Sequence, residues 1–271
     1  KALSREDFEV ASVVLDQLRG EGITLHEGAV VERVTSHAGG IALTLKSQTG
    51  SETIEGTHLL IATGRSPNTA DLGLDVGCIA FDKKGISVNA GLRTSNRRVY
   101  AIGDVVGGAQ FTHVANDHAG IVLRRILFRL PAKVTGHAVP RVTFTDPELA
   151  HVGLEEDAAR KTHGKVNVLR WSFHENDRAQ PERETSGHIK VVTSPRGQIL
   201  GVSIVGAHAG EIIQMWSLAI AQKLNIKAMT TWISPYPTLS EVNKRAAIRY
   251  YASAPGNPLV RKVISWLAKF G

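Results

Sequence analysis

Hydrophobic residues recur at two different spacings in the first part of this 271-residue chain. Over 4–19 they fall every three or four positions, which predicts an amphipathic helix that is capped by Ser4 and ends at Gly20. The next segments alternate apolar and polar residues and are separated by glycines, at 29–34, 41–46 and 52–55. That alternation predicts β-strands joined by hairpins.

Two apolar runs in the middle of the chain each lead into a glycine. The run 59–62 precedes Thr63-Gly64, and the run 99–102 precedes Gly103-Asp104. Both runs predict buried strands, and the glycine lets the backbone come close to a ligand. Because open α/β sheets bind their ligands at the carboxyl ends of strands, Asp104 is interpreted as an acceptor for a ligand hydroxyl.

The rest of the chain has a different order of elements. After a predicted helix at 114–130, alternating strands are expected at 141–144, 149–152, 166–173, 189–193 and 199–205. Helical spacing follows at 211–224 and 239–251. Strands grouped before helices are typical of an α+β domain, whereas the mixed order upstream is typical of α/β. The predicted fold class is therefore α/β followed by α+β.

The last segment, 256–271, combines apolar and basic residues at helical spacing. Its apolar positions are Leu259, Val260, Val263, Ile264, Leu267 and Phe270, and its basic positions are Arg261, Lys262 and Lys269. A short basic amphipathic helix can lie on an anionic membrane surface, or it can pack on its own domain or on a second copy of the chain. Both interpretations stay open.

The two glycine-terminated runs, followed by Thr112-His113-Val114-Ala115, resemble the pyridine nucleotide-disulfide oxidoreductases, among them dihydrolipoyl dehydrogenase, glutathione reductase and mercuric reductase. The resemblance implies a bound FAD and a nicotinamide cofactor, NADH or NADPH. Asp104 would bind a ribityl hydroxyl, and the helix starting near Thr112 would point its N-terminal amides at the flavin ring. The FAD contacts implied are Ala62, Thr63, Gly64, Gly103, Asp104, Thr112, His113, Val114 and Ala115.

The same resemblance divides the chain into four parts. Residues 1–57 correspond to the C-terminal half of an NAD(P)H-binding domain and 58–138 to the C-terminal lobe of an FAD-binding domain, which together give a partial Rossmann-like region. Residues 139–255 correspond to an α+β dimerisation domain with an antiparallel sheet, through which a homodimer is expected. Residues 256–271 form the basic tail.

A candidate for catalysis lies late in the dimerisation segment. Family members carry His-Pro-Thr-x-x-Glu there, and this chain has Tyr236 in place of the histidine and keeps the glutamate as Glu241. The resemblance implies both as catalytic residues, and mercuric reductases also carry a tyrosine near this position. A phenol titrates near pKa ~10 against ~6.5 for imidazole, so Tyr236 is a hydrogen-bond donor rather than a base at neutral pH. The alternative is a buried tyrosine ring without a chemical role.

Val142 and Phe144 match the segment that closes over the nicotinamide in this family. The resemblance therefore implies that they contact the cofactor. The alternative interpretation is that both side chains form the inner face of a strand, since they are two positions apart.

Composition argues against several function classes. The formal charge is +7, but Lys and Arg are interleaved with Asp and Glu, which argues against nucleic-acid binding. Cys78 is the only cysteine and is predicted to be a buried apolar residue, and the histidines show no metal-ligand spacing, so no metal site is expected. No apolar run spans a bilayer and no secretory signal opens the chain, so a cytoplasmic location is expected.

These features predict the C-terminal part of an FAD-dependent NAD(P)H oxidoreductase. Electrons would pass from nicotinamide through flavin to a disulfide or to a metal acceptor such as Hg(II). Taken alone, the chain is expected to be inactive. Two alternatives stay open: a homodimerisation module, and the C-terminal part of a membrane-peripheral flavin-dependent quinone reductase that is anchored by the tail.

Overall fold

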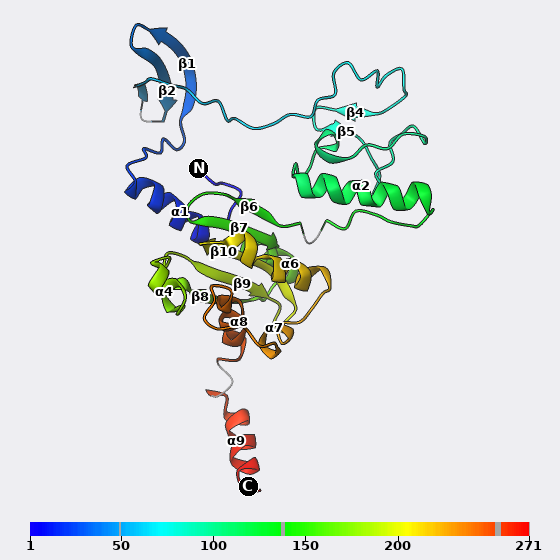
Figure 1. Cartoon of the computed structure of the whole chain (residues 1–271). Helices are drawn as coiled ribbons and strands as arrows, with labels where there is room; N and C mark the ends of the chain where they lie inside the picture. The colour runs from blue at the N-terminus through cyan, green and yellow to red at the C-terminus, as the bar shows by residue number, and fades with distance from the viewer. Residues whose placement is uncertain (49, 137–138, 253–255, 271) are drawn as a thin grey trace. The chain divides into compact units, whose positions relative to one another are not determined.

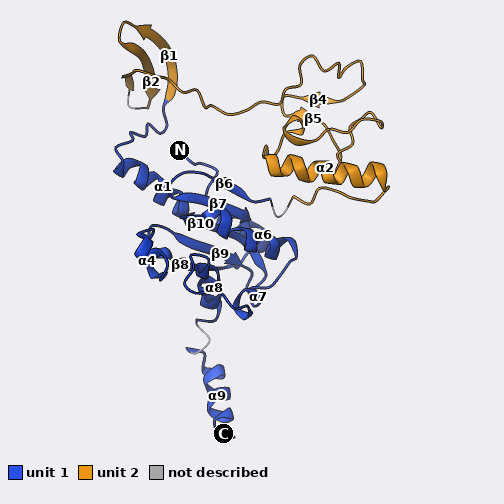
Figure 2. Cartoon of the chain, in the orientation of Figure 1, with its two compact units in different colours: residues 1–29, 137–271 blue, residues 30–136 orange. Residues whose placement is uncertain are grey.

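A computed structural model describes residues 1–48, 50–136, 139–252 and 256–270 of the chain. The chain forms two compact units, coloured separately in Figure 2. The sheet unit combines Lys1–Ala29 with His137–Gly271, and the middle unit is Val30–Gly136. The predicted domain limits at 138 and 255 lie outside the described residues. By packing, residues 1–29 group with the C-terminal part of the chain.

The sheet unit is built on a five-stranded antiparallel sheet with the strand order β6-β7-β10-β9-β8 (Figure 1). The strands are β6 (Arg141–Thr143), β7 (Glu148–Gly153), β8 (Asn167–Ser172), β9 (His188–Thr193) and β10 (Ile199–Gly206). All five lie where the alternating pattern predicts them. Gly197, at φ +81°, makes the turn between β9 and β10.

Different helices cover the two faces of this sheet. On β10, Ile204 belongs to the main core, and its neighbour Val205 points to a second cluster on the opposite face. The main core includes residues of α5 (Ala209–Ile212), α6 (Gln214–Ala221), α7 (Ala228–Thr231) and α8 (Glu241–Ile248). The opposite face is covered by α1 (Phe8–Gly20) and α3 (Glu156–His163). The remaining elements are η2 (Phe173–Glu175), α4 (Ala179–Glu182), η3 (Arg249–Tyr251) and α9 (Pro258–Leu267).

Helix α1 begins later than its sequence pattern predicts. Asp7 is the N-cap residue, and its carboxylate accepts a hydrogen bond from the backbone N–H of Glu9 at 2.9 Å. The prediction that Ser4 caps the helix is therefore wrong. The apolar side of α1 packs on the sheet, because Val10 and Val14 lie in one cluster with residues of β7 and β10.

Two other predicted helices are divided in the structure. The segment 211–224 contains α5 and α6, which are separated at Ile213. The segment 239–251 consists of α8 followed directly by the tighter turn η3. In both cases the apolar spacing located the helical segment, but spacing alone does not show where the backbone hydrogen-bond ladder is interrupted.

The middle unit contains two small antiparallel sheets and one long helix. The predicted meander is confirmed as β1 (Val30–His37), β2 (Gly40–Ser47) and β3 (Gly50–Gly56). A short hairpin follows with β4 (Phe81–Asp82) and β5 (Gly85–Ile86). The helix predicted at 114–130 is confirmed as α2 (Thr112–Leu127), after the turn η1 (Gly103–Val106).

The strands predicted at 59–62 and 99–102 do not form. Residues 59–62 are irregular, and Leu60 and Ile61 are 87% and 74% exposed. Tyr100 makes an isolated antiparallel bridge to Arg93 before the chain enters η1. A strand needs a hydrogen-bonded neighbour along its length, and within the described ranges no strand pairs with either segment.

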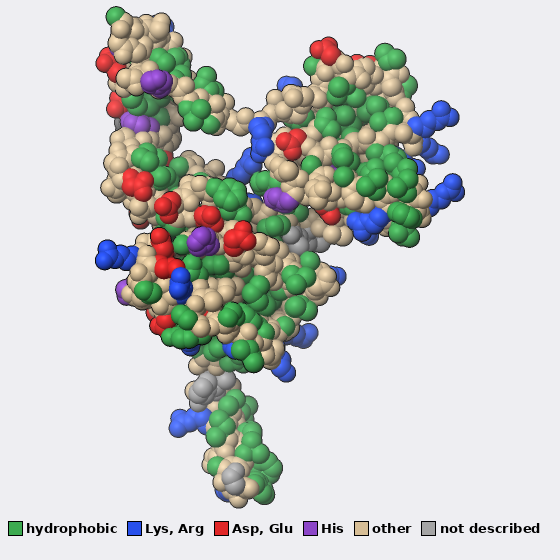
Figure 3. Space-filling model, in the orientation of Figure 1, with side chains coloured by type: hydrophobic (Ala, Val, Ile, Leu, Met, Phe, Trp, Pro, Cys, Tyr) green, Lys and Arg blue, Asp and Glu red, His purple; other side chains and the backbone are tan. Residues whose placement is uncertain are grey.

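Two observations concern the exposed side chains of Cys78 and helix α9, and a third concerns the length and polarity of the helices. Cys78 is exposed and adopts φ +53°, so the prediction of a buried cysteine is wrong. No residue of α9 is buried, and hydrophobic side chains gather on its surface (Figure 3). In the described ranges, every helix is too short or too polar to cross a membrane.

Candidate functional site

The predicted flavin motifs at 103 and 112 meet in the middle unit. Gly103 opens η1 at φ +69°, and its backbone N–H donates to Nδ1 of the buried His118 at 3.2 Å. A Cβ on Gly103 would lie 3.1 Å from Cβ of Ala115 in α2. Glycine is therefore needed both for the backbone conformation and for the close approach of η1 to α2.

Arg65 connects Asp104 to the other glycine turn. Its Nη1 lies 3.8 Å from Oδ2 of Asp104, and its Nη2 donates to the carbonyl oxygen of Gln110 at 2.8 Å. Arg65 directly follows Ala62-Thr63-Gly64, and these three residues are exposed. Since the ion pair between Arg65 and Asp104 is long and exposed, it contributes little stabilisation, and a ligand hydroxyl can bind the carboxylate at little cost. Sequence reasoning missed Arg65.

Helix α2 starts without a side-chain cap. Its N-cap residue, Phe111, makes no capping hydrogen bond, and its first turn has no acidic residue. Thr112 and His113 are exposed there, Val114 is buried and Ala115 is half-buried. The N-terminus of a long helix presents backbone N–H donors and the positive end of the helix dipole, so it favours an electron-rich ligand edge.

These groups fit a flavin nucleotide chemically. The Asp104 carboxylate is an acceptor suited to a sugar hydroxyl, and a Cβ on Gly64, which has φ +116°, would meet no atom within 4 Å. The backbone at Gly64 is thus open to close approach. Leu60, Ile61 and Ile102, which precede the two glycines, are exposed apolar side chains that a planar ring system can cover.

Tyr236 and Glu241, the two candidate catalytic residues, each bond to another residue and not to one another. The Tyr236 hydroxyl donates to Oδ2 of Asp177 at 3.1 Å, and Oε1 of Glu241 accepts from Nε of Arg245 at 2.8 Å. The Asp177 carboxylate raises the pKa of Tyr236, because a phenolate there would face a second negative charge. Tyr236 is 68% exposed, so the alternative of a buried ring is wrong.

Val142 and Phe144 differ in their surroundings. Val142 packs partly on the main core and lies against the backbone of Gly210, where an added Cβ would be 3.3 Å from it. Phe144 is 83% exposed. The interpretation of both as the inner face of a strand is therefore right for Val142 and wrong for Phe144, whose ring stays available for contact.

A polar row that the sequence analysis missed crosses all five strands of the sheet unit. Strand pairing places its members opposite one another in the order Arg141, His151, Ser203, Lys190 and Arg170. Because directly opposed residues of antiparallel strands point to the same face, the row lies on one side of the sheet. This is the side that α1 covers, since Leu149 and Val205 share it.

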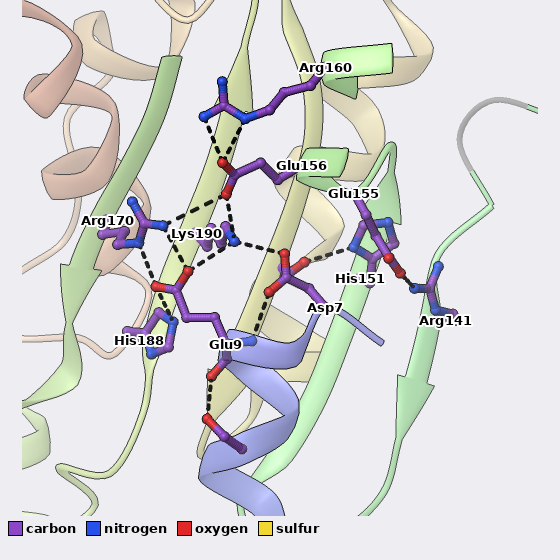
Figure 4. A network of polar contacts seen from close by, with 12 residues as sticks. Asp7, Glu9, Arg141, His151, Glu155, Glu156, Arg160, Arg170, His188 and Lys190 are labelled. Atoms are coloured by element: carbon purple, nitrogen blue, oxygen red, sulfur yellow. Dashed lines mark hydrogen bonds and ion pairs between the residues drawn. The ribbon is translucent and has the colours of Figure 1, made fainter. Parts of the chain in front are cut away.

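Lys190 is the centre of this row (Figure 4). Its Nζ lies 2.7 Å from Oδ2 of Asp7, 2.9 Å from Oε2 of Glu9 and 2.9 Å from Oε2 of Glu156, and its side chain is 5% exposed. Arg170 donates to both carboxylate oxygens of Glu9. The Arg170 hydrogen bonds, together with Lys190, lower the pKa of Glu9 from 4.5 to about 2 despite partial burial. These ion pairs fasten the starts of α1 and α3 to the sheet.

The other end of the row holds a neutral histidine. The ring of His151 is bonded through Nδ1 to Oγ of Ser203 at 2.8 Å and through Nε2 to the carbonyl oxygen of Gly153 at 3.0 Å. Burial lowers the pKa of His151 to about 4, and the neighbouring Arg141 acts in the same direction. Arg141 in turn donates to Glu6 and Glu155. The alternating pattern marks these polar positions, but no local signal predicts their partners.

Two family models match the chain. Residues 1–119 match the model described as pyridine nucleotide-disulphide oxidoreductase, and 139–247 match the dimerisation domain of the same family. The matches confirm the predicted fold class of a nucleotide-binding region followed by an α+β dimerisation domain. Helix α1 falls in the first match, although it packs on the sheet of the second.

Relatives and solved structures agree with these matches. A mercuric reductase of Lysinibacillus sphaericus is 37% identical over 253 residues, which cover 92% of this chain and 46% of the relative. Dihydrolipoyl dehydrogenase 3 of Pseudomonas aeruginosa is 31% identical over 254 residues, which cover 93% of this chain and 54% of that relative. The HOCl-induced flavoprotein disulfide reductase RclA from Escherichia coli superimposes with a TM-score of 0.81 at 27% identity, covering 90% of this chain and 56% of its own. The chain thus spans about half the length of these proteins.

Proposed function

Because this chain belongs to the pyridine nucleotide-disulphide oxidoreductases, we propose that it is the C-terminal part of an FAD-dependent NAD(P)H oxidoreductase. In the proposed reaction two electrons pass from the nicotinamide through the flavin to a disulfide, which becomes two thiols, or to a metal ion such as Hg(II) as substrate. The observation that carries the proposal is the corner where Gly103 brings Asp104 to the uncapped start of α2.

The middle unit supplies the proposed contacts to FAD. Asp104 accepts a hydrogen bond from a ribityl hydroxyl, and Gly103 keeps it close to α2. Ala62, Thr63 and Gly64 border the flavin with exposed backbone. Thr112, His113, Val114 and Ala115 direct the N-terminal amides of α2 toward the ring.

The experiment that tests this site is substitution of Asp104 in the flavoenzyme that carries this chain. Asp104→Ala removes the hydroxyl acceptor, so we expect a lower content of bound FAD, measured by absorbance of the purified protein near 450 nm, a wavelength typical of oxidised flavin. Asp75→Ala, at an exposed carboxylate of the same unit, is the matched control and should retain FAD. Equal FAD content in both variants would contradict the proposed role of Asp104.

The sheet unit supplies the proposed contacts to nicotinamide and acceptor. The exposed ring of Phe144, which directly follows β6, is proposed to contact the nicotinamide, and Val142 holds that strand on the main core. Tyr236 acts at the acceptor as a neutral hydroxyl, because a phenol is protonated at neutral pH and its hydrogen bond to Asp177 favours that form. Glu241 supports the first turn of α8 through its bond to Arg245.

The chain by itself is proposed to dimerise but not to turn over. The match to the dimerisation domain supports a homodimer through 139–255. Light scattering at several protein concentrations should give the mass of a dimer, and incubation with FAD and NADPH should give no NADPH oxidation. A monomer at all concentrations would contradict the expected dimer. Steady NADPH oxidation would contradict the expectation that the chain by itself does not turn over. A cytoplasmic location stays a prediction from the sequence.

The exposed apolar side of α9 favours a second candidate, a membrane-peripheral quinone reductase. Leu259 and Val263 are 74% and 55% exposed, and the helix carries Arg261 and Lys262 with no acidic residue in its first turn. Such a helix is suited to an anionic bilayer surface. The test is cosedimentation with vesicles that contain phosphatidylglycerol, compared with a chain that ends at 255. Equal sedimentation of the two chains would exclude the tail as the anchor.

A further inference from the structure

Two neighbouring side chains hold the loop that carries Tyr236. Asp177 accepts a hydrogen bond from the Tyr236 hydroxyl at 3.1 Å. The side-chain amide of Asn176 donates to the carbonyl oxygen of Thr238, also at 3.1 Å. The loop and its support are about sixty positions apart in the chain, so this pairing depends on the tertiary fold.

The support is rigid because Asn176 is part of the core. Its side chain is 3% exposed, and its Oδ1 accepts hydrogen bonds from the backbone N–H groups of Arg178 and Ala179, each at 3.0 Å. Its own N–H donates to the carbonyl oxygen of Phe173, a fully buried residue. Because the side-chain amide and the backbone N–H of Asn176 are all hydrogen-bonded, the backbone at the next residue, Asp177, is constrained.

The loop is also tied to itself. The hydroxyl of Thr238 donates to the carbonyl oxygen of Pro235 at 2.8 Å and lies 3.1 Å from Oγ of Ser240. Tyr236 lies between these anchor points, and its ring is exposed. The backbone of the loop is thus held at several points, and among the described residues the hydrogen-bond partner of the Tyr236 hydroxyl is Asp177.

We propose that Asp177, and not Glu241, is the carboxylate that positions Tyr236. The hydroxyl donates its single proton to Asp177, so the oxygen lone pairs are turned outward and can accept a hydrogen bond from an incoming thiol. Asn176 fixes the loop in which this happens. The inference rests on the proposed function for its chemistry, and it makes Asp177 a positioning residue, since it acts through Tyr236.

Glu241 bonds to Arg245 and makes no hydrogen bond to Tyr236 among the described residues. Nε and Nη2 of Arg245 lie 2.8 Å and 2.7 Å from Oε1 of Glu241, one helical turn further along α8. The carboxylate is mostly covered, whereas Asp177 is exposed next to the phenol. The raised pKa of Tyr236 has the Asp177 hydrogen bond as its largest cause and Glu241 only as a minor one.

The test is a pH titration of Tyr236 in the chain itself, followed by phenolate absorbance near 295 nm, a wavelength at which tyrosinate absorbs. The Tyr236→Phe variant isolates the signal, because the chain has three other tyrosines. Asp177→Asn should lower the pKa of Tyr236, since it removes the negative charge, and the matched Glu241→Gln should leave it nearly unchanged. A larger drop in Glu241→Gln, or no drop in Asp177→Asn, would overturn the proposal.

A second measurement separates this inference from the proposed function. In the flavoenzyme that carries this chain, Asp177→Asn should slow turnover with the disulfide acceptor several-fold while the rate of flavin reduction by NAD(P)H stays as in wild type. If Asp177→Asn lowers the pKa of Tyr236 but leaves turnover unchanged, Tyr236 has no catalytic role. That result would overturn the proposal that Asp177 is a positioning residue. Asn176→Ala should speed amide exchange in 236–241, and no change there would remove Asn176 from the proposal.

Discussion

The two units of this protein differ most in what covers their sheets. Every residue of β10 is buried, and every residue of β1 is exposed. The strands of the sheet unit have helices on both faces, whereas in β1, β2 and β3 only Leu45 is buried. Similar alternation of apolar and polar residues therefore gives strands in both units, but the burial of those strands depends on elements from elsewhere in the chain.

The difference extends to polar groups. In the sheet unit the centre of the row, His151, Ser203 and Lys190, is buried under α1 and hydrogen-bonded or ion-paired. In the middle unit the ion pair between Asp104 and Arg65 is long and exposed. Buried and fully paired groups stabilise a docked helix, and exposed ones stay available to a ligand. Under the proposed function, the buried row of the sheet unit is structural, and the exposed groups of the middle unit offer the contacts to FAD.

The strongest way to test this contrast is truncation of the largest core side chain. Trp216 is fully buried, and its Nε1 donates to Oδ1 of the buried Asn243 at 2.7 Å. Trp216→Ala leaves a cavity and an unpaired amide, so we expect the free energy of unfolding of the sheet unit to fall by about 4 kcal/mol in urea titrations. Val34→Ala on the exposed strand β1 should change stability by about 0.5 kcal/mol or less. Similar losses in both variants would refute the contrast.

A smaller effect is expected from breaking the centre of the polar row. Lys190→Met leaves the carboxylates of Asp7, Glu9 and Glu156 without their shared cation. We expect this to lower the free energy of unfolding by about 3 kcal/mol. Hydrogen exchange should show faster exchange of α1 amides, while the strand amides of β9 and β10 remain protected. Arg160→Gln, which removes an exposed partner of Glu156, is the control and should cost less than about 0.5 kcal/mol. Unchanged protection of α1 in Lys190→Met would show that the apolar contacts alone hold this helix.

Acid should weaken the sheet unit through its buried histidine, His151. The pKa of His151 is about 4 when folded and 6.5 when unfolded, so between these values the unfolded state binds more protons and stability falls as pH falls. The slope approaches ~1.4 kcal/mol per pH unit for this one group. Urea midpoints at several pH values should show the decline, and His151→Gln should reduce it. Glu9 adds a further loss below pH 4.5, because its pKa is lowered to about 2 in the folded state.

The smallest expected effect concerns the glycine corner of the middle unit. Gly103→Ala introduces a Cβ 3.1 Å from Ala115 at a positive φ, which should cost about 1 to 2 kcal/mol and loosen the start of α2. Gly108→Ala is the matched control, because it has φ +72° but open space around the added Cβ. It should cost about 1 kcal/mol from backbone strain alone. If the two variants lose the same stability, the contact between η1 and α2 does not depend on glycine.

The residue pattern was sufficient to predict the strands of the five-stranded sheet, the meander of the middle unit and the family. Alternation follows from the two-residue repeat of a strand, and Gly103 is required by the conformation of its own backbone. Both signals can therefore be recognised without knowing which distant segments they contact. The motif also marked Tyr236 and Glu241 as candidates, but it contains no signal for Asp177, which lies 59 positions from Tyr236 in the chain.

The fold, and not the residue pattern, shows which groups meet. It placed α1 on the sheet of the dimerisation domain, aligned Arg141, His151 and Lys190 in one row, left the run 59–62 without a strand partner, and brought Asp177 to Tyr236. These pairings join segments far apart in the chain. Local periodicity carries no information about them, because the register of distant segments is set by the packing of the whole unit.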